Sequence, residues 1–180
     1  MKNKEIPKKL HLGCGRIYKS GFYNVDVDPS LKSDKCFDFN SDNWPLPENH
    51  FEYIEMHHVL EHLDNPLRVM ENIWKCCKKD AIVVISVPHW SHFMSWGDLT
   101  HKRVYSSAAF LYYEINYPEY YSKFAKYKVM SKKFTLTRTN MEWINPLFSW
   151  ILNISPLFTE LFLCKIIPVS QIIFKLKVVK

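Results

Sequence analysis

Apolar residues form four short runs in the first third of the chain, each bounded by polar or turn-forming residues. The runs lie at residues 8–12, 21–28, 36–39 and 51–57, and their length predicts short strands. Residues 81–87 form a longer, nearly unbroken run rich in β-branched side chains. Such a run is typical of a central parallel strand that is covered on both faces.

A helix is predicted between the fourth and the fifth of these strands. Asn65-Pro66 marks its start, because proline is favoured at the first helical position. Apolar residues then follow with helical spacing to about Cys77, at Leu67, Met70, Ile73 and Trp74. Strands that are separated by helix or loop indicate an α/β protein rather than an all-β protein.

The pattern changes after the central strand. Residues 89–105 are rich in His, Trp and Ser, which suits a loop that lines a site. We expect a helix from Ser106 or Ser107 to about residue 115, and a strand at residues 133–138. The last segment, residues 172–179, alternates lysine with apolar residues, as an edge strand does.

Composition places the chain among single-domain globular proteins. Its 180 residues make one domain, and 47% hydrophobic with 23% charged residues excludes a disordered or collagen-like chain. The net charge of +6 favours anionic partners without naming one.

Cysteine usage and the basic start of the chain indicate a cellular compartment. Five cysteines without a CxxC pair argue against a disulfide scaffold or a zinc ribbon, so we expect a reducing, cytoplasmic location. No apolar run follows the basic start, and no stretch reaches about 18 apolar residues. We therefore expect neither a signal peptide nor a membrane-spanning helix.

Two glycines and a following acid form the first motif with a chemical meaning. Gly13 and Gly15 follow the first strand, and Asp26 lies in the second. Glycines let a ligand approach the backbone closely, and an acid at the end of the next strand accepts hydrogen bonds from ribose hydroxyls. This order of residues indicates a nucleotide-binding arrangement.

The ordered set of motifs resembles the class I S-adenosylmethionine-dependent methyltransferases, and most closely the small methyltransferase-domain proteins of the type 11-like group. The motifs are Leu10-His11-Leu12-Gly13-Cys14-Gly15, Asn24-Val25-Asp26, Asp38, Leu46-Pro47, Phe51 to Ile54, Val59-Leu60-Glu61-His62, Val87-Pro88 and Asp98 to Arg103. They cover about residues 8–103, and the C-terminal third matches loosely.

The resemblance implies a Rossmann-like, mostly parallel sheet with a lid inserted after the central strand. It implies one methyltransferase domain over residues 1–180, with a cofactor-binding core at 8–87, a substrate lid at 88–130, and C-terminal strands with an apolar cap at 131–180. Only about ten residues separate the glycine turn from the acid of the second strand, too few for a normal crossover helix. We therefore expect an open or abbreviated cofactor pocket.

The resemblance also implies roles for individual residues. The turn Gly13-Cys14-Gly15 would face the methionine part of S-adenosylmethionine. Asp26 would bind the ribose, and Asp38 would lie near the adenine amino group. His57 and His58, at the end of the fourth strand, would face the reactive methyl group.

His58, Glu61 and His62 spell HxxEH, which has three interpretations. A metalloprotease motif needs both histidines on one helical face, whereas this segment continues a strand. Ubiquinone-type O-methyltransferases and small-RNA 2′-O-methyltransferases carry a similar E-x-x-E-H element that binds a divalent metal, and His92 or His101 could supply a further ligand here. Alternatively, Glu61 and His62 only cap the helix and bond the backbone.

The segment after the central strand supplies candidates for catalysis and acceptor binding. His92 and His101 are candidate bases, because a base helps an alcohol acceptor to attack a methyl group. Trp90 could stack on a ring or sugar, and Arg103 could hold an anionic group through its bidentate fork. Exposed loop positions for the histidines and the arginine, and core packing for the tryptophan, are the alternatives.

The apolar C-terminal segment, residues 143–167, has three interpretations. It could complete the core as a cap, form a homodimer interface, or make a peripheral contact with a membrane. Nearby lysines would suit acidic lipid headgroups in the last case.

We expect O-methylation of a small-molecule or glycan-like acceptor, with S-adenosylmethionine as the cofactor. A non-catalytic cofactor-binding or scaffold protein is one alternative, because His11 and Ile17 depart from the family pattern. An RNA-directed methyltransferase is another, on the net charge of +6 and the HxxEH element. Scattered lysines argue against a nucleic-acid partner, which would favour a basic stripe.

Overall fold

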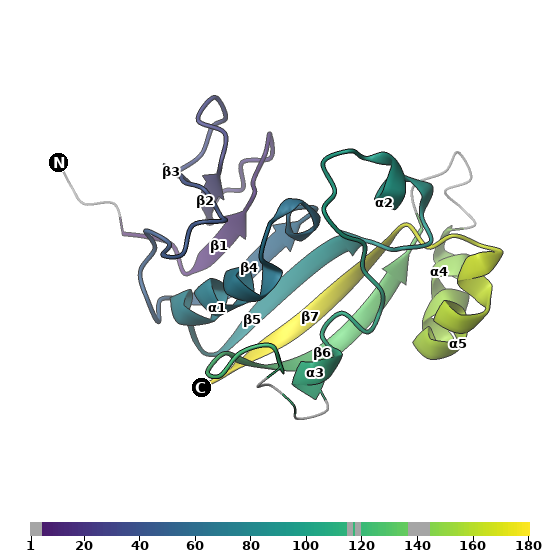
Figure 1. Ribbon diagram of the computed structural model, residues 1–180. Helices are drawn as coiled ribbons and strands as arrows, with labels where there is room; N and C mark the ends of the chain where they lie inside the picture. The colour runs from purple at the N-terminus through teal and green to yellow at the C-terminus, as the bar shows by residue number, and fades with distance from the viewer. Residues whose placement is uncertain (1–4, 115–116, 118–119, 137–144) are drawn as a thin grey trace.

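The computed structural model describes residues 5–114, 117, 120–136 and 145–180. Seven strands form one sheet in the order β3-β2-β1-β4-β5-β7-β6 (Figure 1). The strands are β1 (Lys9–Leu12), β2 (Tyr23–Asp26), β3 (Lys35–Cys36), β4 (Phe51–His57), β5 (Cys77–Pro88), β6 (Lys126–Thr135) and β7 (Gln171–Val179). Strands β1 to β5 pair in parallel, whereas β7 is antiparallel to β5 and β6. The mostly parallel α/β sheet predicted from the sequence is therefore confirmed.

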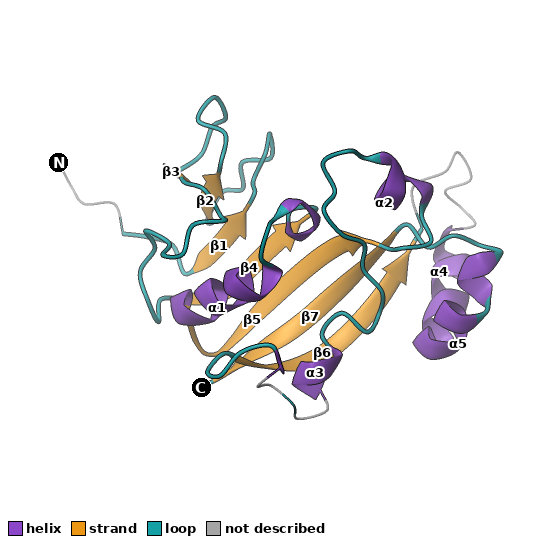
Figure 2. Cartoon of the chain, viewed as in Figure 1, coloured by secondary structure: helices purple, strands orange, loops and turns teal. Residues whose placement is uncertain are grey.

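Helices α1 (Pro66–Cys76) and α3 (Leu111–Glu114) lie in front of the sheet in Figure 2. The predicted start of α1 is confirmed, because Asn65 caps it by accepting a 3.0 Å hydrogen bond from the backbone N–H of Arg68. The remaining helices are α2 (Phe93–Gly97), α4 (Asn145–Ile154) and α5 (Pro156–Leu161), with 3-10 turns at η1 (Leu60–His62) and η3 (Leu163–Lys165).

The core lies between α1 and the front face of the sheet. Alternate side chains of a strand point to one face, so Ile54 and Met56 of β4 are buried together on this face. Val83 of β5 pairs with Leu176 of β7, and both are fully buried. A 2.6 Å hydrogen bond from the buried Tyr127 hydroxyl to a carbonyl of α1 ties β6 to this layer.

Strand β7 corrects the prediction that residues 172–179 form a sheet edge. It lies between β5 and β6, and β6 takes the edge position. The alternating lysines mark a face rather than an edge: Lys175 is exposed, whereas Phe174 and Leu176 are buried on the opposite face. The edge strand β6 begins at Lys126, earlier than the strand predicted at residues 133–138.

The helix predicted from Ser106 to about residue 115 is also shorter than expected. Residues 107–110 form turns, and the helix in the described part of this segment is α3 alone. The Ser106 hydroxyl accepts a hydrogen bond from the backbone N–H of Ala108 at 3.2 Å, and this local bond competes with helical pairing. Residues 115 and 116 lie outside the described part of the chain.

A loop of residues 13–22 replaces a crossover helix between β1 and β2, as the short spacing predicted. It covers β1 and β4 on the face opposite α1. Phe22 packs edge-on against His11 and Tyr53, with ring centroids 6.4 and 6.0 Å apart. Beneath this ring, Lys19 forms an ion pair with the buried carboxylate of Glu55.

One side chain from α4 occupies the free edge of β6 at Phe134. The amide of Asn153 accepts a hydrogen bond from the Phe134 N–H and donates another to the Phe134 carbonyl, each 2.8 Å long. Asn153 therefore satisfies both backbone groups that a further strand would use at this position.

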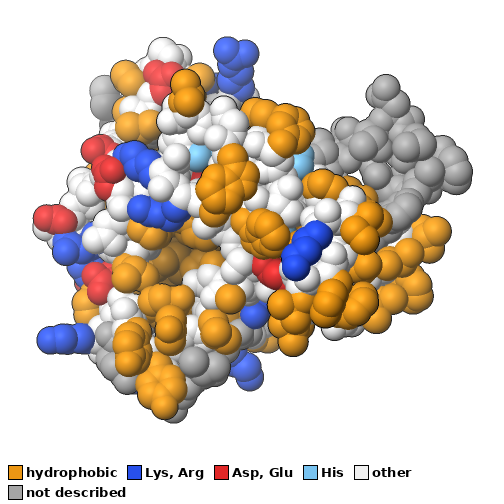
Figure 3. Space-filling view, turned by 45° about the vertical axis from the view of Figure 1, so that its right-hand side comes forward, with side chains coloured by type: hydrophobic (Ala, Val, Ile, Leu, Met, Phe, Trp, Pro, Cys, Tyr) orange, Lys and Arg blue, Asp and Glu red, His pale blue; other side chains and the backbone are white. Residues whose placement is uncertain are grey.

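Helices α4 and α5 bury one side and expose a broad apolar surface on the other. Leu152 and Thr159 are buried, and the Thr159 hydroxyl donates to the Leu152 carbonyl at 2.8 Å. The outer side chains of these helices and of the residues that follow α5 have exposed fractions between 49% and 80%: Leu147, Trp150, Ile154, Leu157, Phe158, Leu161, Phe162 and Ile166. Figure 3 shows apolar side chains gathered on the side of the molecule where these helices lie. The homodimer and the membrane contact through residues 143–167 stay predictions; among the described residues no helix has the length and apolarity to span a bilayer.

Candidate functional site

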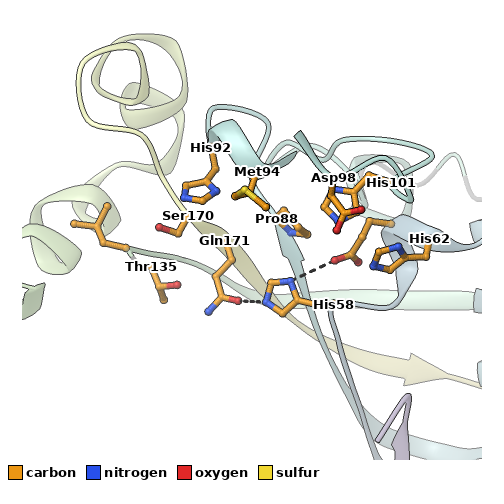
Figure 4. A pocket seen from close by; sticks show the side chains of 12 residues that line it. His58, His62, Pro88, His92, Met94, Asp98, His101, Thr135, Ser170 and Gln171 are labelled. Carbon is orange, nitrogen blue, oxygen red and sulfur yellow. Dashed lines mark hydrogen bonds and ion pairs between the residues drawn. The ribbon is translucent and has the colours of Figure 1, made fainter. Parts of the chain in front are cut away.

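Two neighbouring cavities lie beyond the carboxyl ends of the parallel strands. The glycine cavity has a volume of about 410 Å³, and its wall includes Gly13, Gly15, Asp26 and Asp38. The histidine cavity has a volume of about 690 Å³, and its wall includes four histidines, His58, His62, His92 and His101 (Figure 4). His58 and His62 belong to both walls. A group bound in one cavity therefore adjoins a group bound in the other cavity at these two side chains.

The glycine turn has a backbone that only glycine adopts easily. Gly13 and Gly15 have φ angles of +69° and +52°. A Cβ on Gly13 would lie 2.2 Å from Cγ2 of Val59, so the turn packs directly on the segment after β4. A Cβ on Gly15 would meet no atom of the described residues within 4 Å, so the Gly15 backbone faces open space among them. Cys14, between them, is buried.

Asp26 holds the glycine turn in place. Its Oδ2 accepts a 2.7 Å hydrogen bond from the Gly15 N–H, and its Oδ1 accepts from the backbone N–H groups of Val27 and Asp28. Oδ2 keeps a second lone pair for a ligand hydroxyl. Asp38 is exposed on the same wall, where its carboxylate accepts from the Asn40 N–H at 2.8 Å.

His57 lies outside the walls of both cavities. Strand alternation puts it on the face opposite α1 with Glu55, and its Nδ1 is 2.8 Å from the Ser86 hydroxyl. Burial lowers the pKa of His57, although nearby Glu55 opposes the shift. His58 instead turns toward the cavities, because its φ of +53° breaks the alternation of β4.

His58 is held between two polar side chains. Its Nε2 is 2.7 Å from Oε1 of Gln171, and its Nδ1 is 3.3 Å from the carboxylate of Glu61 (Figure 4). The interaction with Glu61 raises the pKa of His58 against the effect of burial. Gln171 could not be found from sequence, because 113 positions separate it from His58.

The HxxEH residues do not share a helix. His58 has a left-handed backbone, and only η1, residues 60–62, follows it before the chain extends again. This geometry excludes the metalloprotease interpretation, which needs both histidines on one helical face. The structure groups Glu61 and His62 with His101 instead, and one potential ligand atom of each lies within 4.8 Å of the others.

His92 and His101, the two candidate bases, both line the histidine cavity but differ in setting. His101 is held by a hydrogen bond from its Nδ1 to the Ser95 carbonyl at 3.1 Å, with Asp98 3.8 Å from its Nε2. His92 precedes α2, and burial lowers its pKa. A lowered pKa keeps an imidazole neutral near pH 7, the form that accepts a proton.

Trp90 and Arg103 lie outside the cavity walls. The Arg103 guanidinium donates to the carbonyls of Leu63 and Asp64, at 2.7 and 2.9 Å, and so caps the turn η1. The Trp90 indole N–H donates to Glu160 of α5 at 3.0 Å. Both side chains brace the lid, and their predicted contact with an acceptor stays a prediction.

Together, the sheet order, the glycine turn after β1 and the adjoining cavities define a methyltransferase of the class I type. The chain belongs to the methyltransferase-domain family, whose model matches residues 11–126, more than half of its length. The protein is therefore an S-adenosylmethionine-dependent methyltransferase, as the sequence motifs indicated. No curated protein sequence matches this one.

Solved methyltransferases share the fold at low sequence identity. An S-adenosylmethionine-dependent methyltransferase from Archaeoglobus fulgidus is 17% identical, with a TM-score of 0.57 over 96% of this chain and 86% of that one. One from Mesorhizobium loti is 11% identical, with a TM-score of 0.60 over 94% and 89% of the two chains. A phosphoethanolamine N-methyltransferase from Haemonchus contortus, solved with phosphomonomethylethanolamine and S-adenosylhomocysteine, is 10% identical, with a TM-score of 0.56 over 99% and 50%.

The glycine cavity fits the cofactor of this family. The open backbone at Gly15 admits a ligand, because no side chain of residues 5–114, 117, 120–136 and 145–180 fills the space that a Cβ there would face. Asp26 and Asp38 offer carboxylate oxygens for ribose and adenine donors, and Phe39 and Leu63 add apolar surface. The volume of about 410 Å³ is within the roughly 300–1,000 Å³ that small-molecule sites occupy.

Proposed function

We propose that the protein transfers a methyl group from S-adenosylmethionine to a hydroxyl oxygen of a small or glycan-like acceptor in the histidine cavity. The observation that carries this proposal is the shared wall of the two cavities. His58 and His62 border both, so an acceptor in one cavity adjoins a cofactor in the other.

The wall of the histidine cavity suits a neutral, polar acceptor with some apolar surface. His58, His92 and Gln171 supply hydrogen-bonding groups, whereas Pro88 and Met94 supply apolar contact. Placing two reactants in adjoining cavities removes much of the entropic barrier to their reaction. This contribution matters most for methyl transfer, which depends on alignment more than on acid–base chemistry.

S-adenosylmethionine supplies an electrophilic methyl group bound to a positively charged sulfur. The acceptor oxygen forms the new bond to the methyl carbon, the carbon–sulfur bond breaks, and its electron pair stays on sulfur. The hydroxyl proton needs an acceptor in the cavity wall. We assign this role to His92, because burial lowers its pKa and so favours the neutral imidazole.

His58 and Gln171 would position the acceptor rather than take its proton. The Glu61 carboxylate raises the pKa of His58, which favours the charged, donating form. A donor of this kind orients an acceptor oxygen without removing its hydrogen.

The test has two stages. Calorimetric titration with S-adenosylmethionine and S-adenosylhomocysteine measures cofactor binding, and mass spectrometry of sugar and phenol panels then detects methylated products. We expect His92→Asn to lower kcat by about 100-fold, the scale of general-base catalysis, with cofactor affinity unchanged. His57→Asn, outside both cavities, is the matched control. Cofactor binding with methylation of amines but of no hydroxyl would overturn the proposal.

A further inference from the structure

We propose that Glu61, His62 and His101 bind one divalent transition-metal ion in the wall of the histidine cavity. Each residue offers one ligand atom, and these atoms lie within 4.8 Å of one another. The residues come from separate segments, with Glu61 and His62 in η1 and His101 in the loop after α2. An ion at this position would hold the lid against the end of β4.

Glu61 provides the strongest evidence for a bound cation. Its side chain is only 1% exposed, yet within the described part of the chain neither carboxylate oxygen has a hydrogen-bond partner. The Nδ1 atom of His58 is 3.3 Å from Oε1, without hydrogen-bond geometry. A buried carboxylate is costly unless it is paired or coordinates a metal. A protonated His58 supplies a positive charge nearby but leaves both oxygens without a hydrogen bond among the described residues, so a cation that coordinates Glu61 directly would satisfy them.

The hydrogen bonds of both histidines show which ring nitrogen can bind such an ion. Nδ1 of His101 is 3.1 Å from the Ser95 carbonyl, and Nδ1 of His62 is 3.3 Å from the Thr100 carbonyl. A carbonyl only accepts hydrogen bonds, so each Nδ1 carries the hydrogen and each Nε2 keeps its lone pair. Metal-binding histidines commonly donate their second N–H to a backbone carbonyl in this way.

The Thr100 hydroxyl supports the same assignment for His62. This hydroxyl donates to Oδ1 of Asp98 at 2.6 Å, so its oxygen is left to accept from His62 Nδ1 at 3.0 Å. Asp98 thereby fixes Thr100, which in turn fixes the ring of His62. The other oxygen of Asp98 lies 3.8 Å from Nε2 of His101, at the rim of the site.

Two imidazoles and one carboxylate suit Zn²⁺, Co²⁺ or a related ion better than Mg²⁺ or Ca²⁺, which prefer all-oxygen sites. Catalytic zinc sites use three protein ligands of this kind and keep one position open. All three residues line the histidine cavity, so the open position would face the acceptor.

The role of the ion in methyl transfer rests on the proposed function, whereas its binding does not. A divalent ion lowers the pKa of a coordinated hydroxyl and fixes its orientation. His62 borders both cavities, so an ion on it would present the acceptor oxygen at their junction. The proton would still leave to His92, which lies outside the three-residue cluster.

The experiment uses the full chain, treated with a chelator and freed of it, without S-adenosylmethionine. Calorimetric titration with ZnCl₂ is expected to show one ion per chain, and CoCl₂ is expected to give visible d–d absorption. Glu61→Gln and His101→Asn are each expected to weaken Zn²⁺ binding at least about tenfold, since even loss of an outer-shell partner costs that much. His92→Asn, a histidine of the same cavity, should bind Zn²⁺ as the wild type does.

Thermal melting separates loss of the site from loss of the fold. Glu61→Gln also removes the carboxylate that pairs with His58, so the fold is judged on His101→Asn, which keeps that pair and should melt close to the wild type when both are metal-free. Zn²⁺ should raise the melting temperature of the wild type and not that of the variant. Absence of saturable Zn²⁺ and Co²⁺ binding would overturn the inference, as would equal binding by Glu61→Gln and His101→Asn. Methyl transfer without ion binding would refute the metal site alone; ion binding without hydroxyl methylation would refute the proposed function alone.

Discussion

Replacing Glu160 with glutamine tests how the lid is attached to the C-terminal helices. The Glu160 carboxylate, on α5, accepts hydrogen bonds from the Ser107 N–H at 2.9 Å and the Trp90 indole N–H at 3.0 Å. Nε2 of His89 lies 3.3 Å away. These donors belong to the segment after β5, so one side chain joins the lid to α5.

The magnitude follows from the pKa of this carboxyl group. Burial raises the pKa of Glu160, but the bonds from His89, Ser107 and Trp90 outweigh it and lower the pKa from 4.5 to about 2. This difference corresponds to roughly 3 kcal/mol of stability in the ionised form, an upper value for a side chain that is 14% exposed.

The sign of the pH dependence is fixed by the direction of the shift. The folded pKa is depressed, so the stabilisation is complete above pH 4.5 and is lost as the pH falls toward about 2. Glu160→Gln lacks this titration, so its stability deficit of about 1–3 kcal/mol at pH 7 should shrink in acid.

Urea denaturation of the wild type and of Glu160→Gln between pH 3 and 7 measures this difference. All other carboxyl groups titrate in both proteins, so the subtraction isolates Glu160. Glu52→Gln is the matched control, because Glu52 is exposed and pairs with Lys78 at the surface, where ion pairs contribute little. A stability difference that stays constant from pH 3 to 7 would refute the assigned role of Glu160.

Three further predictions concern the cofactor cavity and the apolar surface. Gly13→Ala should weaken S-adenosylhomocysteine binding at least about tenfold in calorimetry, because its Cβ would lie 2.2 Å from Val59 at a φ of +69°; an unchanged affinity would contradict the packing of the turn. Asp26→Ala should weaken cofactor binding by about 1–3 kcal/mol, and an unchanged Kd would remove Asp26 from the ribose role. Trp150→Ser with Leu157→Ser, 65% and 69% exposed in the wild type, should shift unfolding stability by less than about 1 kcal/mol. The same pair should reduce sedimentation with anionic vesicles if residues 143–167 contact lipid, or the dimer fraction in ultracentrifugation if they contact a second copy.

The first half of the fold could be predicted because its signals are local. The glycine turn, the acid of β2 and the Asn65-Pro66 helix start each lie within a few residues of the feature that they specify. The C-terminal half depends on pairing between distant strands. The lysines of β7 gave a correct strand but a wrong position, since alternation reports which face is exposed and not which neighbours pair.

The sequence predicted which residues line the candidate site better than it predicted which of them lie in contact with one another. His62 and Glu61 stand together in sequence, but the residue grouped with both within 4.8 Å is His101, whereas His58 pairs with Glu61. The difference arises from the left-handed backbone of His58. A histidine in the sequence does not predict this backbone conformation, which is uncommon for residues other than glycine. Gln171 reaches the site only because β7 lies beside β5.

The Asn153 amide at the β6 edge has a consequence for how copies of this protein can meet. Open strand edges template aggregation, because another chain can add to them through backbone hydrogen bonds. At Phe134 both backbone groups are already occupied, so an incoming strand would first have to displace α4. Exposed Lys126, Lys128 and Lys133 along the same strand add charge against a second copy of themselves. Growth of the sheet through β6 is therefore opposed at Phe134 by α4 and along the strand by the lysines.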